Sequence, residues 1–131
     1  MKAYVLDTHI LWWYLTGNAK KLGTAARRAF QEGNDKQAIL YVPVLTLAEI
    51  WDVNHNQGYP IDFRKMLQIL QQTAQFVFVP FDVDDVEAYA DLAAIPQSRD
   101  RIIATVCRKM EAPLITVDRA IIESGMVEVI Q

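Results

Sequence analysis

Ala3-Tyr4-Val5-Leu6-Asp7, close to the start of the chain, is an apolar run that ends in a carboxylate. Leu114-Ile115-Thr116-Val117-Asp118, near the other end, has the same form. Each run is typical of a buried strand whose last residue is an aspartate. Ligands bind beyond the carboxyl ends of the strands in an open parallel sheet. We therefore expect the two aspartates side by side, and carboxylates gathered there without basic partners indicate a divalent metal site.

The composition is that of a globular protein. Of the 131 residues, 52% are hydrophobic and 22% are charged, which allows a buried core and argues against disorder. One domain over residues 1–131 is expected, with no membrane span and no signal peptide. The only cysteine, Cys107, excludes an internal disulfide. It lies in an apolar helical pattern that predicts a small buried residue. These features favour the cytoplasm.

The net charge of −3 gives no overall basic surface for nucleic acid, although it does not exclude one. No Cys or Cys/His spacing fits a zinc site.

Strand and helix patterns alternate along the chain. Apolar runs predict strands over residues 3–7, 38–42, 76–79, 114–117 and 127–130. Helical spacing predicts helices over residues 9–16, 20–33, 62–74 and 98–111. Further helices are expected from Thr46, from Asp82 or Asp84, and from about residue 119. This order implies an α/β protein, a three-layer α/β/α sandwich with a central, mostly parallel sheet of about five strands. The fully apolar strands agree, because helices cover both faces of such a sheet.

Four acidic residues stand out by their positions. Asp7 and Asp118 end strands, and Asp100 lies in the first turn of a predicted helix. Glu49 lies in a largely apolar helix, where a carboxylate needs a partner. Mg²⁺ and Mn²⁺ prefer oxygen ligands and retain waters, so a few convergent carboxylates suffice to bind them. Such a metal would lower the pKa of a bound water and neutralise charge on a phosphate, which suits phosphodiester hydrolysis.

Each of these acids also has an ordinary structural explanation. Asp100 fits a helix-terminal acid favoured by the helix dipole. Glu49 fits the partner of Thr46 in a capping box. A strand-end aspartate often forms a turn or caps the next helix. Three further acids follow the strand at 76–79, and we assign them to capping and solvent: Asp82, Asp84 and Asp85.

Four segments carry a resemblance to a known family: Val5-Leu6-Asp7-Thr8-His9, Leu47-Ala48-Glu49-Ile50, Asp100-Arg101-Ile102-Ile103-Ala104 and Pro113-Leu114-Ile115-Thr116-Val117-Asp118-Arg119. In this order they resemble the PIN-domain ribonucleases, and more narrowly the VapC-type toxins of prokaryotic toxin–antitoxin pairs. The resemblance covers essentially the whole chain. It implies a Mg²⁺- or Mn²⁺-dependent endoribonuclease, the toxin of a type II toxin–antitoxin system.

The resemblance also implies roles for the four acids. Asp7 and Asp100 would hold the metal most directly. Glu49 and Asp118 would bind the metal or its waters, or orient the attacking water. All four would form the catalytic site.

Four neighbours of these acids are candidates for substrate binding. Thr8 and Thr116 match hydroxyl positions that flank the first and last acids of the family, although Thr116 also fits an ordinary β-branched strand residue. Arg99 and Arg101 flank Asp100 and could hold phosphates, or form ion pairs with the acidic cluster. Many relatives carry a longer His-x-Asp-Pro-x-Asp-Arg stretch before the third acid, and residues 95–101 keep only its final Asp-Arg.

The resemblance implies an RNA substrate, a small cognate antitoxin and a homodimer, with the exposed part of the apolar 46–74 region as the candidate partner surface. Two alternatives remain. A phosphatase with a strand-tip aspartate nucleophile needs a second aspartate two residues later, where this chain has His9. A non-catalytic PIN-like domain that binds RNA or protein would commonly lack one of the acids, and all four are present.

Overall fold

The computed structural model describes all residues, 1–131, and contains five strands in one parallel sheet. The strands are β1 (Lys2–Leu6), β2 (Ala38–Pro43), β3 (Phe76–Val79), β4 (Leu114–Ile115) and β5 (Val129–Ile130). Their order across the sheet is β3-β2-β1-β4-β5, and every neighbouring pair is parallel. The first strand in the sequence is therefore the central strand of the sheet, and the chain changes direction across the sheet between β1 and β4.

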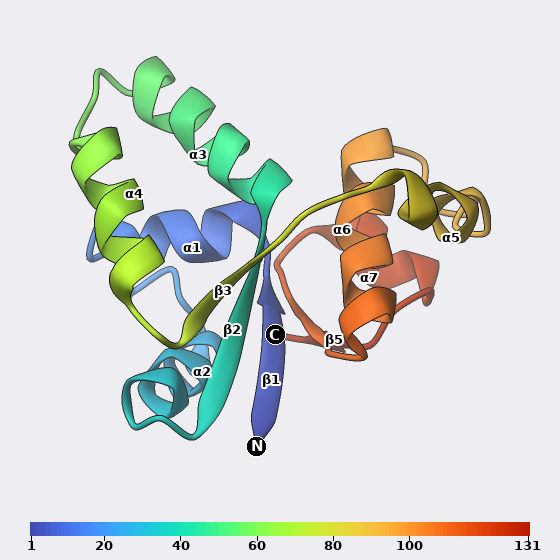
Figure 1. Cartoon of the computed structure of the whole chain (residues 1–131), viewed down its shortest axis with the longest axis horizontal. Helices are drawn as coiled ribbons and strands as arrows, with labels where there is room; N and C mark the ends of the chain where they lie inside the picture. Colours follow the sequence, from blue (N-terminus) through green and yellow to red (C-terminus); the bar gives the residue numbers. More distant parts are fainter.

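Seven α-helices and one short 3-10 helix connect the strands. They are α1 (Thr8–Leu15), α2 (Thr24–Asn34), α3 (Val44–Asn56), α4 (Phe63–Gln72), the 3-10 helix η1 (Val83–Asp85), α5 (Val86–Ala90), α6 (Ser98–Met110) and α7 (Arg119–Ser124). Helices α1 to α4 lie on one side of the sheet, and α5 to α7 lie on the other (Figure 1). The predicted three-layer α/β/α sandwich is confirmed. No helix is both long enough and apolar enough to span a membrane.

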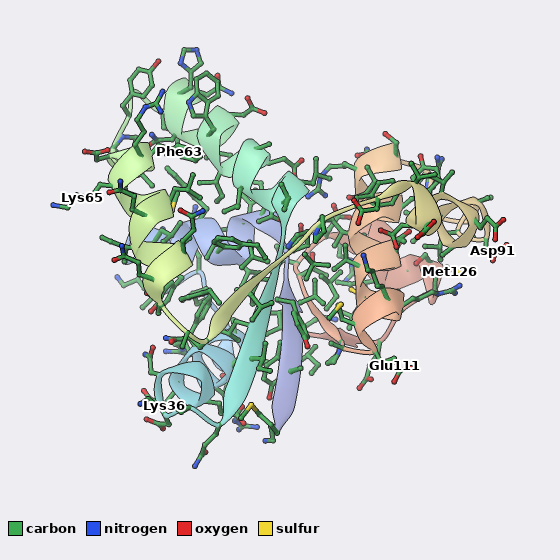
Figure 2. All side chains as sticks on the ribbon, viewed as in Figure 1. Lys36, Phe63, Lys65, Asp91, Glu111 and Met126 are labelled. Carbon is green, nitrogen blue, oxygen red and sulfur yellow. The ribbon has the colours of Figure 1, made fainter.

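The alternation of side chains along β1 explains why both faces of the sheet are apolar. Tyr4 and Leu6 pack into the larger core, against α1 to α4, whereas Val5 packs into a second core with Ile103 of α6 and Ile121 of α7. Successive strand residues point to opposite faces, so a strand between two helical layers must be apolar at every position. Side chains fill the space on both sides of the sheet (Figure 2), and charged residues such as Lys65 and Glu111 lie at the periphery.

The beginning of α3 differs from the prediction. The helix begins at Val44, directly after Pro43, so Thr46 lies inside the first turn and caps nothing. Its buried hydroxyl has no hydrogen-bond partner. The capping box between Thr46 and Glu49 is therefore wrong, because the helix starts earlier than the capping residue, and Glu49 is free to face elsewhere.

The segment after β3 also differs from the prediction. The single helix expected to reach about residue 94 is the short pair η1 and α5, which ends at Ala90. Asp82 and Asp85 form a capping box that starts η1. Asp85 therefore takes part in capping, as predicted, but it does not lie in solvent. It is 8% exposed and lies 3.2 Å from Lys109 Nζ, because α6 packs against this turn.

Candidate active site

The strand order brings the four predicted acids to one place. Asp7 follows β1, Asp118 follows β4 by a short loop, and these two strands are neighbours. The Asp7 amide donates to the carbonyl of Ile115 over 3.1 Å, which fixes the end of β1 against the end of β4. Helix α3 leaves the other neighbour, β2, and brings Glu49. The first turn of α6 brings Asp100. This edge, at the point where the strand order reverses, is the usual binding site of such sheets.

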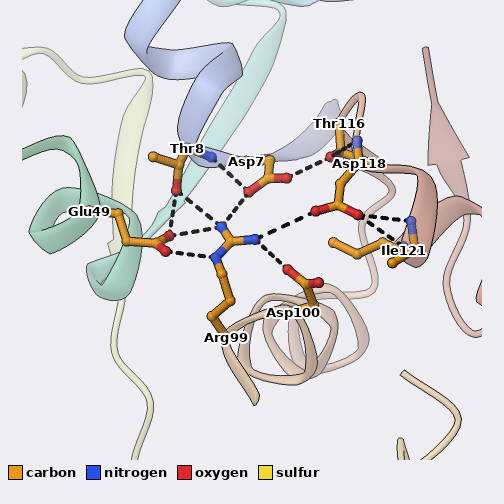
Figure 3. A network of polar contacts seen from close by, with 9 residues as sticks. Asp7, Thr8, Glu49, Arg99, Asp100, Thr116, Asp118 and Ile121 are labelled. Atoms are coloured by element: carbon orange, nitrogen blue, oxygen red, sulfur yellow. Dashed lines mark hydrogen bonds and ion pairs between the residues drawn. The ribbon is translucent and has the colours of Figure 1, made fainter. Parts of the chain in front are cut away.

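Arg99 lies at the centre of the acids and contacts all four (Figure 3). Its Nη2 lies 2.9 Å from Asp7 Oδ1, and its Nε lies 2.6 Å from Glu49 Oε2. Its Nη1 bonds to Asp100 Oδ1 and lies 4.0 Å from Asp118 Oδ2. The expectation of acids without a basic partner is therefore wrong. For Arg99, the ion pair with the acidic cluster is what the structure contains.

Two threonine hydroxyls orient the acids. Thr8 donates from Oγ1 to Glu49 Oε1 over 2.6 Å, and Thr116 donates from Oγ1 to Asp7 Oδ2 over 2.6 Å. The Thr116 hydroxyl also accepts from the Asp118 amide over 3.0 Å. Thr116 therefore does more than fill a strand position, since its hydroxyl links the first acid to the main chain of the last.

The strand-end acids cap helices as well as forming the site. Asp7 Oδ1 accepts from the Thr8 amide over 2.8 Å at the start of α1. Asp118 Oδ1 accepts from the amides of Ala120 and Ile121 at the start of α7, while its Oδ2 faces Arg99. From the sequence, each of these aspartates could be a helix cap or a site residue. In the structure each is both, because a carboxylate has two oxygens with several acceptor sites.

Asp100 is the most buried of the four acids. Its side chain is 1% exposed, and its Oδ2 is buried without a hydrogen-bond partner. Burial raises the pKa of Asp100, and the carboxylates of Asp118 and Asp7 raise it further, against the opposing charge of Arg99. Burial acts to lower the pKa of Arg99, but Glu49 and Asp7 outweigh it, so the guanidinium pKa lies above its ordinary value and the group stays charged.

The donor chemistry of the acids fits a hard divalent cation. The four acids and the two threonines offer only carboxylate and hydroxyl oxygens, as Mg²⁺ and Mn²⁺ prefer, and the unpartnered Oδ2 of Asp100 is a buried oxygen in need of a positive partner. As the side chains lie, however, no group of three or more acids is arranged to hold a metal ion. The Arg99 guanidinium lies between them. The carboxylate oxygens therefore suit a divalent cation in kind, while the Arg99 guanidinium occupies the space between them in this structure.

The site opens onto a cavity of about 470 Å³. Its walls include Asp7, Glu49, Arg99, Asp118 and also Asp52, which is not among the predicted site residues. Asp52 lies three residues after Glu49 on α3, and this spacing places both on one helix face. That spacing is the signal that could have identified it.

Arg101, the other arginine beside Asp100, bonds to none of the four acids. Its Nε donates to the carbonyl of Ile95 over 2.6 Å, and its Nη2 donates to the carbonyl of Pro96 over 2.9 Å. Its Nη1 donates to the Tyr89 hydroxyl over 3.0 Å. Arg101 thus fixes the loop before α6, because the helix turns its side chain away from the acids.

Three comparisons relate this chain to known proteins. The family model described as the PIN domain matches residues 4–124. The fold is similar to VapBC2 from Rickettsia felis bound to a DNA fragment from its promoter, with a TM-score of 0.73 and 15% identity over 98% of this chain and 97% of that one. It is also similar to FitAcB from Neisseria gonorrhoeae, with a TM-score of 0.67 and 17% identity over 98% of this chain and 96% of that one. A search of curated proteins found no match.

Proposed function

The chain belongs to the PIN domain family, whose members are generally nucleases, and we propose that it is a Mg²⁺- or Mn²⁺-dependent endoribonuclease, the toxin of a type II toxin–antitoxin pair. The observation that carries this proposal is the gathering of Asp7, Glu49, Asp100 and Asp118 at the switch point of the sheet. The similar structures from toxin–antitoxin complexes support the biological setting.

Each acid has a role in this proposal. Asp7 and Asp100 hold the metal, and the unpartnered Asp100 Oδ2 is a ready ligand. Glu49 and Asp118 line the cavity and bind the metal or its waters, or orient the attacking water. When bound, the metal supplies a water of lowered pKa and neutralises charge on the phosphate. Thr8 and Thr116 keep Glu49 and Asp7 oriented through their hydroxyls.

Partners follow from the same proposal. RNA enters the cavity, and the tail of a small antitoxin enters it too, while the rest of the antitoxin and a second copy of the chain bind on another surface. The candidate surface for these proteins is the exposed apolar part of α3, α4 and the loop between them. It includes Trp51, Tyr59 and Ile69, which are 44%, 58% and 52% exposed. A cytoplasmic location and a homodimer remain predictions of this proposal.

One observation favours a second candidate, a non-catalytic PIN-like domain that binds RNA or protein. Arg99 already neutralises the acids, as a structural ion-pair network would. A protein that binds no Mn²⁺ under any condition would support this candidate.

The test compares Asp7→Asn with Asp91→Asn in RNA cleavage. Transfer, ribosomal and messenger RNA are each incubated with the protein and Mn²⁺ or EDTA. Asp7→Asn should lower the rate by about 100-fold or more, because it removes a charged ligand while keeping the side-chain shape. Asp91 is an exposed acid in the turn after α5, so its variant should cleave like the wild type. An Asp7→Asn protein of unchanged activity would contradict the proposal, and circular dichroism checks that both variants fold.

A further inference from the structure

We propose that Arg99 is a built-in counter-ion that competes with divalent metal for the acidic site, so that the metal binds only when the guanidinium leaves. The inference rests on the proposed metal-dependent function. It makes Arg99 a residue that sets the affinity of the site for metal. The catalytic roles implied by the family resemblance belong to the four acids and do not include Arg99.

Contacts with all four acids converge on the Arg99 side chain. Arg99 binds Glu49 with two nitrogens, Nε to Oε2 at 2.6 Å and Nη2 to Oε1 at 2.8 Å. The same Nη2 reaches Asp7, and Nη1 reaches Asp100 and Asp118. The guanidinium is therefore the positive charge that neutralises the four carboxylates.

A divalent ion at the centre of the acids would repel the guanidinium there. Two neighbouring cations repel each other, most strongly beside a carboxylate as buried as that of Asp100. The guanidinium contacts all four carboxylates, and no three of the acids are arranged to hold a metal ion in this structure. The guanidinium and a divalent ion are therefore alternative occupants of the same carboxylates.

The Arg99 side chain can leave the acids without unfolding its surroundings. It lies in the first turn of α6, and the hydrogen bonds of its side chain are to the acids and the Thr8 hydroxyl. The side chain is 27% exposed and lines the open cavity of about 470 Å³. Rotation about its side-chain torsions moves the guanidinium into that cavity, while the helix stays in place.

Arg101 makes the contrast clear. It lies two residues further along α6, and its donors bind the carbonyls of Ile95 and Pro96 and the Tyr89 hydroxyl. Arg101 is therefore tied to the main chain, whereas Arg99 is tied mainly to the acids with which a metal would compete.

The experiment measures Mn²⁺ binding by titration calorimetry, without RNA, for the wild type, Arg99→Met, Arg99→Lys and Arg119→Met. Arg119→Met is the matched control, because Arg119 is adjacent to Asp118 but pairs only with Glu123, and its side chain is 73% exposed. We expect Arg99→Met to bind Mn²⁺ about tenfold more tightly than the wild type or better, since it removes a competing cation. Arg119→Met should stay within about twofold of the wild type, because exposed charges interact weakly.

Thermal unfolding gives a second readout. In EDTA, Arg99→Met should melt below the wild type, because its four carboxylates lack a counter-ion. Mn²⁺ should raise its melting temperature more than that of the wild type, since ligands that bind only the folded state stabilise it. Arg99→Lys keeps the positive charge but replaces the guanidinium, which binds several acids at once, by a single ammonium group. It should therefore fold in EDTA and bind Mn²⁺ with an affinity between those of the wild type and Arg99→Met.

The outcomes separate this inference from the proposed function. Arg99→Met that binds Mn²⁺ no more tightly than the wild type overturns the inference, and the proposed function stands if the wild type still cleaves RNA. If Arg99→Met does not fold, the same criterion applies to Arg99→Lys. Tighter binding in the Arg99 variants, with no RNA cleavage by any protein, supports the inference and contradicts the nuclease. No Mn²⁺ binding by any protein overturns both.

Discussion

Thr116 donates a hydrogen bond to Asp7 over 2.6 Å, although 109 positions separate them in the sequence. Both residues are buried, with exposed fractions of 1% and 7%. The same hydroxyl accepts from the Asp118 amide. One side chain of modest size thus aligns the first acid of the chain with the loop that carries the last.

Thr116→Val tests this alignment. The substitution keeps the shape but leaves an oxygen of Asp7 without its donor, so the free energy of unfolding should fall by about 1–3 kcal/mol. Affinity for Mn²⁺ should fall as well, because Asp7 loses its fixed orientation. Thr105→Val is the matched control, since the buried Thr105 hydroxyl donates only to the carbonyl of Arg101 within α6. Equal Mn²⁺ affinities in the two variants would contradict the role of Thr116.

Glu49 and Asp52 allow a comparison of two acids on one helix face. Both line the cavity, but only Glu49 bonds to Thr8 and Arg99. Glu49→Gln should weaken Mn²⁺ binding and slow RNA cleavage by about 10- to 100-fold, because it removes a charged ligand or its water contact. Asp52→Asn makes the same change in charge and should alter both by about twofold or less. The comparison uses titration calorimetry and initial cleavage rates, and an Asp52 effect as large as that of Glu49 would be evidence against these roles.

Asp85 should give the fold a pH dependence that is independent of the site. A hydrogen bond from the Asp82 amide lowers the pKa of Asp85 below its ordinary 3.8, and Lys109 lowers it further, although burial opposes them. Since the folded-state pKa is the lower one, the ionised group stabilises the fold above pH 3.8, and this stability is lost as the pH falls through the folded-state pKa.

Asp85→Asn should therefore melt below the wild type at pH 7, and the difference should shrink in strong acid. The neighbouring Asp84 is exposed, so Asp84→Asn is the control and should show no such trend. Melting curves from neutral to strongly acidic pH make the measurement. A difference between Asp85→Asn and the wild type that does not change with pH would contradict the argument.

Cys107 should be chemically inert in the folded protein. Burial raises the pKa of its thiol to about 12, and Asp7 contributes to the increase. The reactive thiolate is then scarce at pH 8, so iodoacetamide should modify the denatured chain and leave the native one unmodified over the same time. Mass spectrometry of both samples decides the point, and rapid labelling of the native protein would contradict it.

Much of this fold could be predicted from local sequence. The strand at 76–79 agrees with the structure, and that at 38–42 is one residue shorter than β2, because their apolar runs end at turn signals. The proximity of Asp7 and Asp118 follows from a general rule: ligands bind beyond the carboxyl ends of strands in an open parallel sheet, and both residues follow such strands. The prediction that Thr46 caps α3 is wrong, because the first residue of a helix depends on the chain just before it. Here Pro43 ends the strand and α3 starts at once.

The sequence does not show which of Arg99 and Arg101 contacts the acids. Both flank Asp100, and an α-helix turns about 100° per residue, so the two arginines point in nearly opposite directions. Which one meets the acids depends on how α6 is rotated against the sheet. That rotation is set by the packing of residues such as Ile103 and Val106 in the second core. It cannot be predicted from the residues next to Asp100.

The place of β1 between β2 and β4 has a consequence for synthesis of the protein on the ribosome. Translation delivers Asp7 well before Asp118, and domains fold as units as they emerge. A nascent chain ending at Met110 contains Asp7, Glu49 and Asp100 but lacks β4, Thr116 and Asp118. If all four acids are needed to cut RNA, a chain of that length cannot cleave its own messenger or ribosome. Activity then appears only after Asp118 has been added.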